Sequence, residues 1–88
     1  MKFEWDEDKN LVNIQKHGIS FEDAIQAFLD PMRKIRLNSK HSAIELRYYC
    51  LGMIDSRVLT VRFTIRSSTV RIIGAGYWRE GKKIYEQD

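Results

Sequence analysis

The chain has 88 residues, a formal net charge of +3 and a sequence pI of about 9.2. Apolar residues make up 43% and charged residues 31%, which is the composition of one globular domain with a modest core. The single cysteine excludes an internal disulfide, and one cysteine with two histidines gives no metal-ligand pattern, so we expect neither metal nor cofactor. No apolar run reaches the roughly 18 residues of a membrane span and no signal peptide is recognisable, so we expect a cytoplasmic protein without membrane contact.

The first elements predicted along the chain are a short strand and a helix. Residues 2–5 alternate polar and aromatic side chains, which is typical of a strand with its aromatic side chains on the core. Asp6 suits the N-cap of a helix over residues 7–17, and Gly18 suits the left-handed position that ends it. This helix has a narrow apolar stripe formed by Leu11, Val12 and Ile14.

A second helix is predicted from the N-cap Ser20 to about residue 29. Its apolar residues follow the spacing of three and four that is typical of a helix with one side on a core. These residues are Phe21, Ala24, Ile25, Phe28 and Leu29. Asp30-Pro31 ends the helix, because the residue before a proline avoids the helical conformation.

The rest of the chain consists mainly of predicted strands joined by short turns. Residues 32–37 suggest a charged edge strand, residues 38–42 a polar loop and residues 44–54 the next strand. Residues 57–66 alternate almost without fault and are the strongest strand signal, and residues 69–75 form the returning strand. We therefore predict a single α+β domain. It has a short N-terminal strand, two helices on one face, a four-stranded mainly antiparallel sheet and a short C-terminal tail or helix.

The polar side of the strongest strand carries arginines and no acid. Arg62 and Arg66 alternate with apolar residues, so both should lie on the side of the sheet away from the core. In a meander of the later strands, Glu45 and Arg47 fall on the same side. Arg71 joins them if the register of its strand allows. The sequence thus predicts a patch of arginines with one acid on the sheet.

The C-terminal tail interleaves basic and aromatic residues. They are Tyr77, Trp78, Arg79, Lys82, Lys83 and Tyr85. Cations that neutralise phosphates and rings that stack on unpaired bases are what RNA-binding sheet surfaces use. The same pattern also fits solvated strand faces with aromatic residues that pack the tail onto the sheet. Composition alone favours this second interpretation.

Several motifs between residues 3 and 75 together follow one family pattern. They are Phe3-Glu4-Trp5-Asp6, Lys9-Asn10, Asn13, Lys16-His17-Gly18-Ile19, Phe21, Ala24, Phe28, Asp30-Pro31, Glu45, Arg47, Gly52 and Val70-Arg71-Ile72-Ile73. In order and spacing they resemble the BrnT family, bacterial ribonuclease toxins of type II toxin–antitoxin systems. The resemblance implies a RelE-like fold and metal-independent RNA cleavage that inhibits translation. It also implies neutralisation by a BrnA-like antitoxin, through which the toxin would contact DNA and form oligomers.

The resemblance turns the arginine patch into a candidate active site. RNA cleavage without a metal needs a base for the 2′-hydroxyl, cations for the charge on phosphorus and an acid for the leaving oxygen. We predict that Arg66 and Arg71 hold the phosphate with help from Arg47. Glu45 would orient an arginine, and Tyr85 would donate a proton. The predicted RNA-binding residues are Arg62, Trp78, Arg79, Lys82 and Lys83.

One departure from the family pattern leaves other functions open. Family members commonly continue the Arg-Ile-Ile strand with Ser-Ala-Arg, whereas this chain has Gly74-Ala75-Gly76. The missing arginine favours a weak or inactive member that binds an antitoxin and acts in transcriptional autoregulation. A small RNA-binding module without toxin activity is a third possibility. His17 is a candidate catalytic residue, because histidines often transfer protons in ribonucleases. At the end of a helix, however, we expect its imidazole to form hydrogen bonds with the last free carbonyls.

Overall fold

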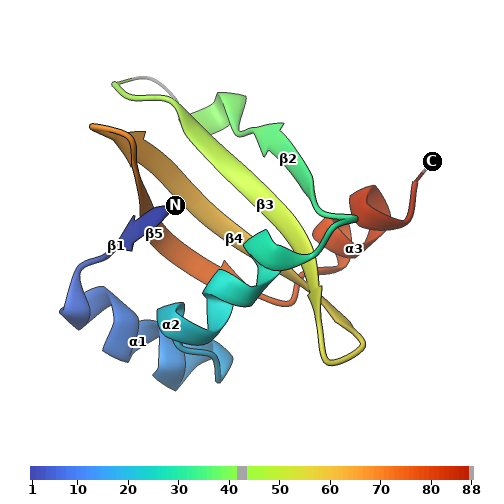
Figure 1. The fold of residues 1–88 in the computed structure, drawn as a ribbon. Coiled ribbons are helices and arrows are strands. Elements are labelled where there is room, and N and C mark those ends of the chain that lie inside the picture. Colours follow the sequence, from blue (N-terminus) through green and yellow to red (C-terminus); the bar gives the residue numbers. More distant parts are fainter. Residues whose placement is uncertain (42–43, 88) are drawn as a thin grey trace.

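The protein is built on one twisted sheet with helices against both of its faces (Figure 1). The computed structural model describes residues 1–41 and 44–87. The elements are, in chain order, β1 (Lys2–Glu4), α1 (Glu7–His17), α2 (Phe21–Ala24), the 3₁₀ segment η1 (Ile25–Leu29), β2 (Lys34–Leu37), the 3₁₀ segment η2 (Ser39–His41), β3 (Arg47–Ile54), β4 (Arg57–Arg66), β5 (Thr69–Gly76) and α3 (Arg79–Glu86). No helix in this part of the chain is long and apolar enough to cross a membrane.

The strand order β1-β5-β4-β3-β2 confirms the α+β class but gives the sheet five strands instead of four. The difference arises because β1 pairs in parallel with β5, which makes the first and last strands neighbours. The other pairs are antiparallel, as predicted. β2 and β3 begin later than expected, at Lys34 and Arg47. Residues 39–41 of the predicted loop form η2, and residue 42 lies outside the described residues.

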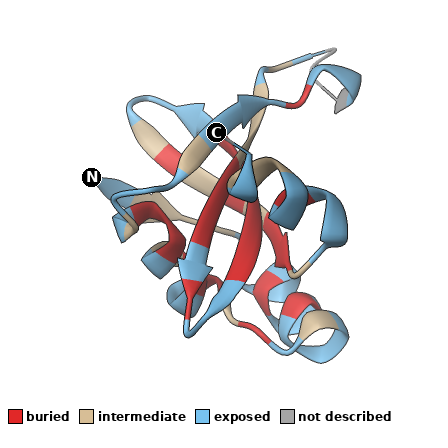
Figure 2. Cartoon of the chain, turned by 90° about the vertical axis from the view of Figure 1, so that its right-hand side faces the viewer, coloured by how far each residue is buried: buried red, intermediate tan, exposed pale blue. Residues whose placement is uncertain are grey.

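The strand register defines two faces of the sheet. The core face carries Cys50, Leu59, Val61, Phe63 and Ile72, all of which are buried. The opposite face, here called the arginine face, carries Arg47, Arg62, Arg66 and Arg71. Buried residues run along the middle strands and the inward sides of the helices (Figure 2). Cys50 is buried, and this burial raises the pKa of its thiol to about 12, as for a cysteine that is part of the core.

The segment predicted as one helix over residues 20–29 is α2 followed by η1. Both pack on the core face, where Phe21, Ala24 and Ala27 are fully buried. The Ala27 carbonyl lies over Gly52 of β3, where any Cβ atom would collide with it. Gly52 therefore lets the backbone of η1 approach the sheet closely, and this contact accompanies the change from α-helical to 3₁₀ winding.

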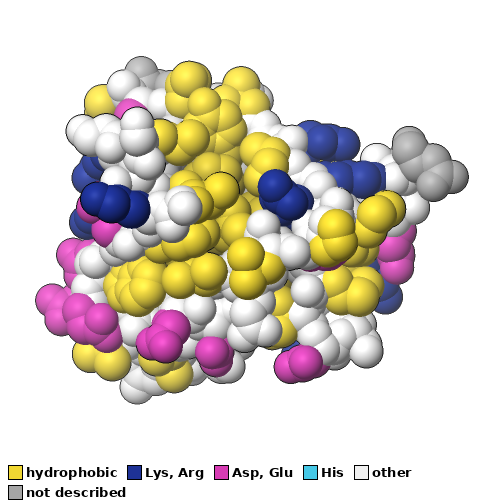
Figure 3. All heavy atoms as spheres, viewed as in Figure 1, with side chains coloured by type: hydrophobic (Ala, Val, Ile, Leu, Met, Phe, Trp, Pro, Cys, Tyr) yellow, Lys and Arg dark blue, Asp and Glu magenta, His cyan; other side chains and the backbone are white. Residues whose placement is uncertain are grey.

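The core face continues beyond α2 and η1 as an exposed apolar surface. By register, Ile35 and Leu37 of β2 and Ile65 of β4 belong to the core face, but they are 43%, 53% and 54% exposed. Ile65 was expected in the core. Figure 3 shows hydrophobic side chains gathered over the part of this face that the helices leave uncovered. Exposed apolar side chains that lie side by side in this way are typical of a contact site for another protein.

The helix α1 has the predicted bounds, with Asp6 as N-cap and Gly18 as left-handed C-cap. It turns a polar side towards the protein, however, because Asn10 and Asn13 are buried. The predicted apolar stripe is exposed instead: Leu11 by 57%, Val12 by 47% and Ile14 by 41%. The apolar stripe therefore gave the wrong orientation for this helix.

The two buried asparagines fix α1 by bonding to backbone groups of other elements. Asn10 Oδ1 accepts a hydrogen bond from the Phe21 N–H at 2.8 Å. Asn13 Oδ1 accepts from the Ala75 N–H at 3.1 Å, and its Nδ2 donates to the Ala75 carbonyl at 2.9 Å. The same Nδ2 donates to the Ile19 carbonyl at 3.0 Å. These bonds satisfy the buried amides, which explains why polar side chains can face inward here.

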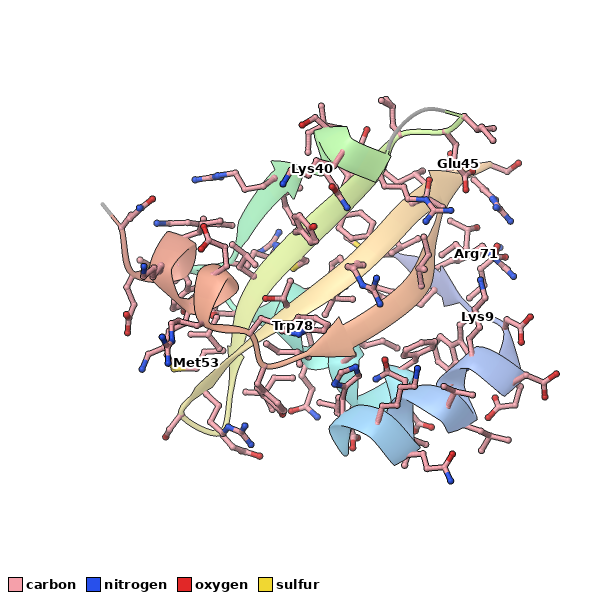
Figure 4. The ribbon with its side chains drawn as sticks, turned by 180° about the vertical axis from the view of Figure 1, so that it is seen from behind. Lys9, Lys40, Glu45, Met53, Arg71 and Trp78 are labelled. Carbon is pink, nitrogen blue, oxygen red and sulfur yellow. The ribbon has the colours of Figure 1, made fainter. Side chains whose placement is uncertain are left out.

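The C-terminal element is a helix, α3, and it lies on the arginine face (Figure 4). Leu51, Val58 and Thr60 belong to the arginine face by register, yet they are buried at the end of the sheet where α3 packs on β3 and β4. Gly81 of α3 packs directly on Thr60, where a Cβ atom would collide with the hydroxyl. α3 thus covers one end of the arginine face and leaves the other end open.

We predict that Gly18→Val lowers the free energy of unfolding by about 1 kcal/mol or more. Gly18 has φ of 70°, and no atom lies within 4 Å of a Cβ built there, so the cost comes from backbone strain and not from a clash. Urea unfolding measures it. Gly18→Asn is the matched control, because asparagine tolerates the left-handed conformation and should cost less. Equal stability of wild type and Gly18→Val would contradict the assignment.

Candidate functional site

The four arginines of the arginine face lie on three neighbouring strands. Arg47 on β3 is opposite Thr64 of β4, and Thr64 is opposite Arg71 of β5. Because directly paired residues project to the same side, the predicted common face of these arginines is confirmed. In Figure 4 this face of the sheet is turned towards the viewer, and Glu45 and Arg71 lie at the end that α3 does not cover. The register alone therefore assembles the predicted patch.

Arg66 is held by Glu45 in a two-pronged ion pair. Its Nε donates to Glu45 Oε2 at 3.2 Å and its Nη2 to Oε1 at 3.0 Å. These hydrogen bonds lower the pKa of the Glu45 carboxyl and raise that of the guanidinium. The Arg66 side chain is 51% exposed, so solvent screens the pair and its contribution to stability is small. Glu45 thus orients an arginine in this structure, as the sequence suggested.

Arg71 forms a second ion pair, with Glu4 on the neighbouring strand β1. Glu4 lies directly opposite Arg71 in the parallel pairing, and Arg71 Nη1 is 3.1 Å from Glu4 Oε2. The side chain is therefore on the arginine face and not in the helix layer. Glu4 was not predicted as a site residue, because nothing in the sequence indicated that β1 would pair with β5.

Arg62 differs from Arg66 and Arg71, since it forms no ion pair with any described residue. Its guanidinium lies flat on Gly74 of β5, where a Cβ atom would collide with it. The Arg62 Cζ atom is 5.7 Å from the centre of the Trp78 ring. A β-bulge at Ile73 interrupts the β4–β5 pairing next to Arg62. Bulges of this kind often redirect side chains beside functional sites.

Trp78 packs on Gly76 in the same way. A Cβ atom on Gly76 would lie 2.8 Å from the indole, so any larger residue would displace the ring. The edge of the His17 imidazole meets the indole, with ring centres 5.2 Å apart and the planes at 68°. Gly76 therefore leaves room for an aromatic ring. His17 does not make the expected bond to a helix carbonyl, since no described hydrogen bond involves it.

Two hollows flank Arg62 and Trp78. One, of about 380 Å³, lies between α3 and the sheet and is mainly apolar, with Tyr49, Leu51, Trp78 and Ile84 among its lining residues. The other is a groove of about 290 Å³ beside α1, lined by Asp8, Lys9, Val12, Asn13, Lys16, His17, Arg62 and Ile73. The groove beside α1 brings together three fixed cations and one acid, so an anion would be favoured there.

Tyr85 lies at the other end of the sheet from the open arginines. Its hydroxyl donates to Asp30 Oδ2 at 2.5 Å, and the same oxygen accepts from the Met53 N–H at 2.8 Å. Met53 is six residues along β3 from Arg47, a distance of about 20 Å in a strand. Tyr85 is therefore not brought together with the arginine patch. Its predicted role as a proton donor stays a prediction.

The predicted RNA-binding residues of α3 are also separate from the patch. Arg79, Lys82 and Lys83 are exposed, and the first two line a further hollow beside the β3–β4 turn. α3 itself is attached through Tyr85 and through Lys34 of β2, whose Nζ donates to the carbonyls of Ile84, at 2.9 Å, and Gln87. Lysines on α3 therefore form a second cationic area at the covered end of the sheet.

The sequence did not predict that Asn10, Asn13 and Asp30 connect separate elements of the fold. Their side chains form hydrogen bonds with the backbone of Phe21, Ala75 and Met53, respectively. The only indication of a special role was that all three belong to the family motif. Within residues 1–41 and 44–87, no group of three His, Cys, Asp or Glu side chains is placed to hold a metal ion.

The fold and the arginine face define a small α+β protein with a cationic sheet surface. A search of curated proteins gives no match. Residues 5–81, however, match the family model described as the ribonuclease toxin BrnT of a type II toxin–antitoxin system. Because the match covers most of the chain, the protein belongs to the BrnT family. It is thus a member of a family of ribonuclease toxins, and family membership implies an antitoxin as its partner.

We predict that Tyr85→Phe lowers the free energy of unfolding by roughly 1 kcal/mol near neutral pH, because Asp30 loses a hydrogen bond. This bond lowers the pKa of Asp30 and raises that of Tyr85 to about 12. The Asp30 contribution is complete above its ordinary pKa of 3.8 and is lost as the pH falls through the lower folded value. The Tyr85 contribution is complete below about pH 10 and is lost towards pH 12.

Urea unfolding of both proteins across this pH range measures the difference. The stability gap between wild type and Tyr85→Phe should be constant near neutral pH and should shrink in acid. A gap that persists unchanged in acid would contradict the Asp30 contact as its source. A variant of unchanged stability that no longer cleaves RNA would instead favour the proton-donor role of Tyr85.

Proposed function

We propose that this protein is a metal-independent endoribonuclease that cleaves RNA and thereby inhibits translation, with the arginine face as its RNA-binding surface. The observation that supports this most directly is the register that puts Arg47, Arg62, Arg66 and Arg71 on one side of the sheet. Family membership supplies the class of reaction. The open end of the face gives a strand of RNA access to these cations.

RNA cleavage does not need a nucleophile from the protein, because the 2′-hydroxyl of the RNA itself attacks. The protein must mainly stabilise the charge that develops in the transition state. As this oxygen attacks the adjacent phosphorus, negative charge grows on the phosphoryl oxygens. Planar guanidinium groups can hold two of these oxygens at once, which suits arginine better than lysine. Arg66 and Arg71 are the proposed phosphate-binding pair, and Arg47 assists them.

The ion pairs of Arg66 and Arg71 are compatible with this role. Both pairs are partly exposed, and exposed pairs contribute little to stability, so an incoming phosphate can displace the carboxylates at small cost. Until then, Glu45 and Glu4 hold the guanidinium groups in place. Preorganised cations of this kind lose less rotational freedom when substrate binds.

A second candidate function rests on Gly76. If the arginine commonly found at this position is essential, the chain would be a weak or inactive member that binds its antitoxin and contributes to transcriptional autoregulation. Induced expression in bacteria separates the two. Growth arrest with RNA cleavage supports the ribonuclease, whereas a stable antitoxin complex without arrest supports the inactive member.

We predict that Arg66→Ala and Arg71→Ala each reduce RNA cleavage by about 10²–10³-fold, because each removes a cation that holds a phosphate of the substrate in place. Their melting temperatures should stay within about 2 °C of wild type, since both side chains are on the surface. Arg33→Ala is the matched control: it removes the same charge from the turn before β2 and should leave cleavage unchanged. Unchanged cleavage by both folded arginine variants would refute the proposed site.

We further propose that an acidic or amphipathic segment of a BrnA-like antitoxin covers the arginine face. Opposite charges on the two surfaces would speed association and leave the toxin little time free. The antitoxin would also provide the contact with DNA and a route to larger assemblies. The exposed apolar part of the core face, around Leu37, is the competing contact surface.

We predict that Arg66→Glu slows association with the antitoxin and that wild-type association slows as salt concentration rises. The matched variant Leu37→Asp changes the exposed apolar surface on the other side of the sheet and should have little effect. Association rates at two salt concentrations, with the antitoxin encoded beside this protein, provide the measurement. A strong effect of Leu37→Asp together with none of Arg66→Glu would place the antitoxin on the core face.

A further inference from the structure

We propose that His17 is the proton acceptor for the attacking 2′-hydroxyl, acting in the groove between α1 and β5, with Arg62 on the phosphate and Trp78 under a base. The proposal rests on the ribonuclease function proposed above. In this proposal the attacked phosphate lies at Arg62, and Arg66, Arg71 and Arg47 hold neighbouring phosphates of the same RNA strand. Four observations carry it: the position of His17, its open nitrogens, the neighbouring cation and the exposed ring.

The position of His17 follows from Asn13. The two residues are four apart on α1 and so lie on the same side of the helix. Asn13 bonds to the Ala75 peptide in both directions, which fixes this side of α1 against the edge of β5. His17 therefore stands beside the stretch Gly74–Gly76, and its ring meets Trp78. The imidazole is held in place by elements far apart in the sequence.

The nitrogens of His17 are open to a ligand. No hydrogen bond from either nitrogen to a described residue is found, and the residue is half-buried in the wall of the groove. The charged groups that face it are Asp8, Lys9 and Lys16 on its own helix and Arg62 on β4, while β5 contributes the apolar Ile73. A histidine kept only for packing would not need this polar, cationic setting.

Arg62 and Trp78 complete the binding site for one nucleotide. No carboxylate of a described residue holds the Arg62 guanidinium, so it is ready to bind a phosphate. Gly74 and Gly76 form a flat floor on which the guanidinium and the indole lie next to each other. Trp78 is 37% exposed and borders the apolar hollow towards α3, which suits a stacked nucleobase.

The proposed step conserves atoms and electrons without any further reactant. The 2′-oxygen attacks the adjacent phosphorus, and its proton passes to a nitrogen of neutral His17. The O2′–P bond forms while the P–O5′ bond breaks, and the departing 5′-oxygen takes a proton from water. The products are a 2′,3′-cyclic phosphate and a 5′-hydroxyl end, and His17 returns its proton to solvent. Arg62 stabilises the charge on the phosphoryl oxygens.

Two variants of His17 separate proton transfer from packing. His17→Phe keeps an aromatic edge against Trp78 but has no nitrogen, and His17→Gln keeps a polar group. Binding is measured with a single-stranded 2′-O-methyl RNA, which lacks the attacking hydroxyl, by the fluorescence anisotropy of a dye on the RNA, so that variants of Trp78 can be compared in the same way. Cleavage is measured with the corresponding RNA across about pH 5–9. Arg33→Ala is the charge control.

We expect both variants to cleave at least about 100-fold more slowly, with binding within about 3-fold of wild type and unchanged melting temperatures. The rise of the wild-type rate with pH should be absent in both. Free imidazole should restore part of the cleavage by His17→Ala. Arg62→Ala and Trp78→Ala should weaken binding of the 2′-O-methyl RNA, whereas Arg33→Ala should not.

Cleavage at the wild-type rate by folded His17→Phe and His17→Gln would overturn the proton-transfer role while leaving the ribonuclease function intact. A parallel loss of binding, melting temperature and cleavage in His17→Phe, together with no recovery of His17→Ala in imidazole, would also overturn it in favour of packing. A wild-type protein that neither binds nor cleaves any RNA would refute the ribonuclease function itself, and the role of His17 with it.

Discussion

The paired hydrogen bonds between the Asn13 amide and the Ala75 peptide determine how the two halves of this protein meet. β1 pairs with only the first three residues of β5, so the edge of β5 beyond Arg71 has no neighbouring strand. The Asn13 amide takes the place of that strand by donating to one carbonyl and accepting from one N–H, as a backbone would. A buried edge without such a partner would leave two polar groups unsatisfied. The position of α1, and of every side chain on its inner side, depends on this contact.

The second constraint on the site is the pair of glycines in β5, Gly74 and Gly76, which acts together with the Asn13–Ala75 contact. Gly74 and Gly76 carry no side chain on the arginine face, so Arg62 and Trp78 can lie against the strand itself. α1 approaches the same stretch from the edge, which brings His17 to the indole. An arginine at position 76 would occupy the space of the Trp78 ring. In this chain, Gly76 leaves the space that the Trp78 ring fills beside Arg62.

The sequence allowed the strands and their faces to be predicted well, but not what covers each face. Alternation in β4 was enough to show that Arg62 and Arg66 share a side, because a period of two fixes the side whatever the partner strand is. It could not show that α3 would bury Thr60 on that side, since burial depends on a helix some twenty residues later. The sequence also could not show that the Asn13 side chain points into the protein. Its partner is the Ala75 peptide, 62 residues away, and the apolar residues beside Asn13 suggested the opposite orientation of the helix.

The two ends of the arginine face are thus specialised by different physical means. At the open end, arginines are held by surface carboxylates, which position them but bind too weakly to exclude a phosphate. At the end near α3, no described carboxylate neutralises Arg62, which is positioned by a glycine floor and an aromatic ring. An extended RNA strand lying along the face would meet both ends in succession, because neighbouring phosphates are spaced widely enough to reach separate cations. The ion-paired arginines would then align the strand, while the unpaired one sits where a proton acceptor is also at hand.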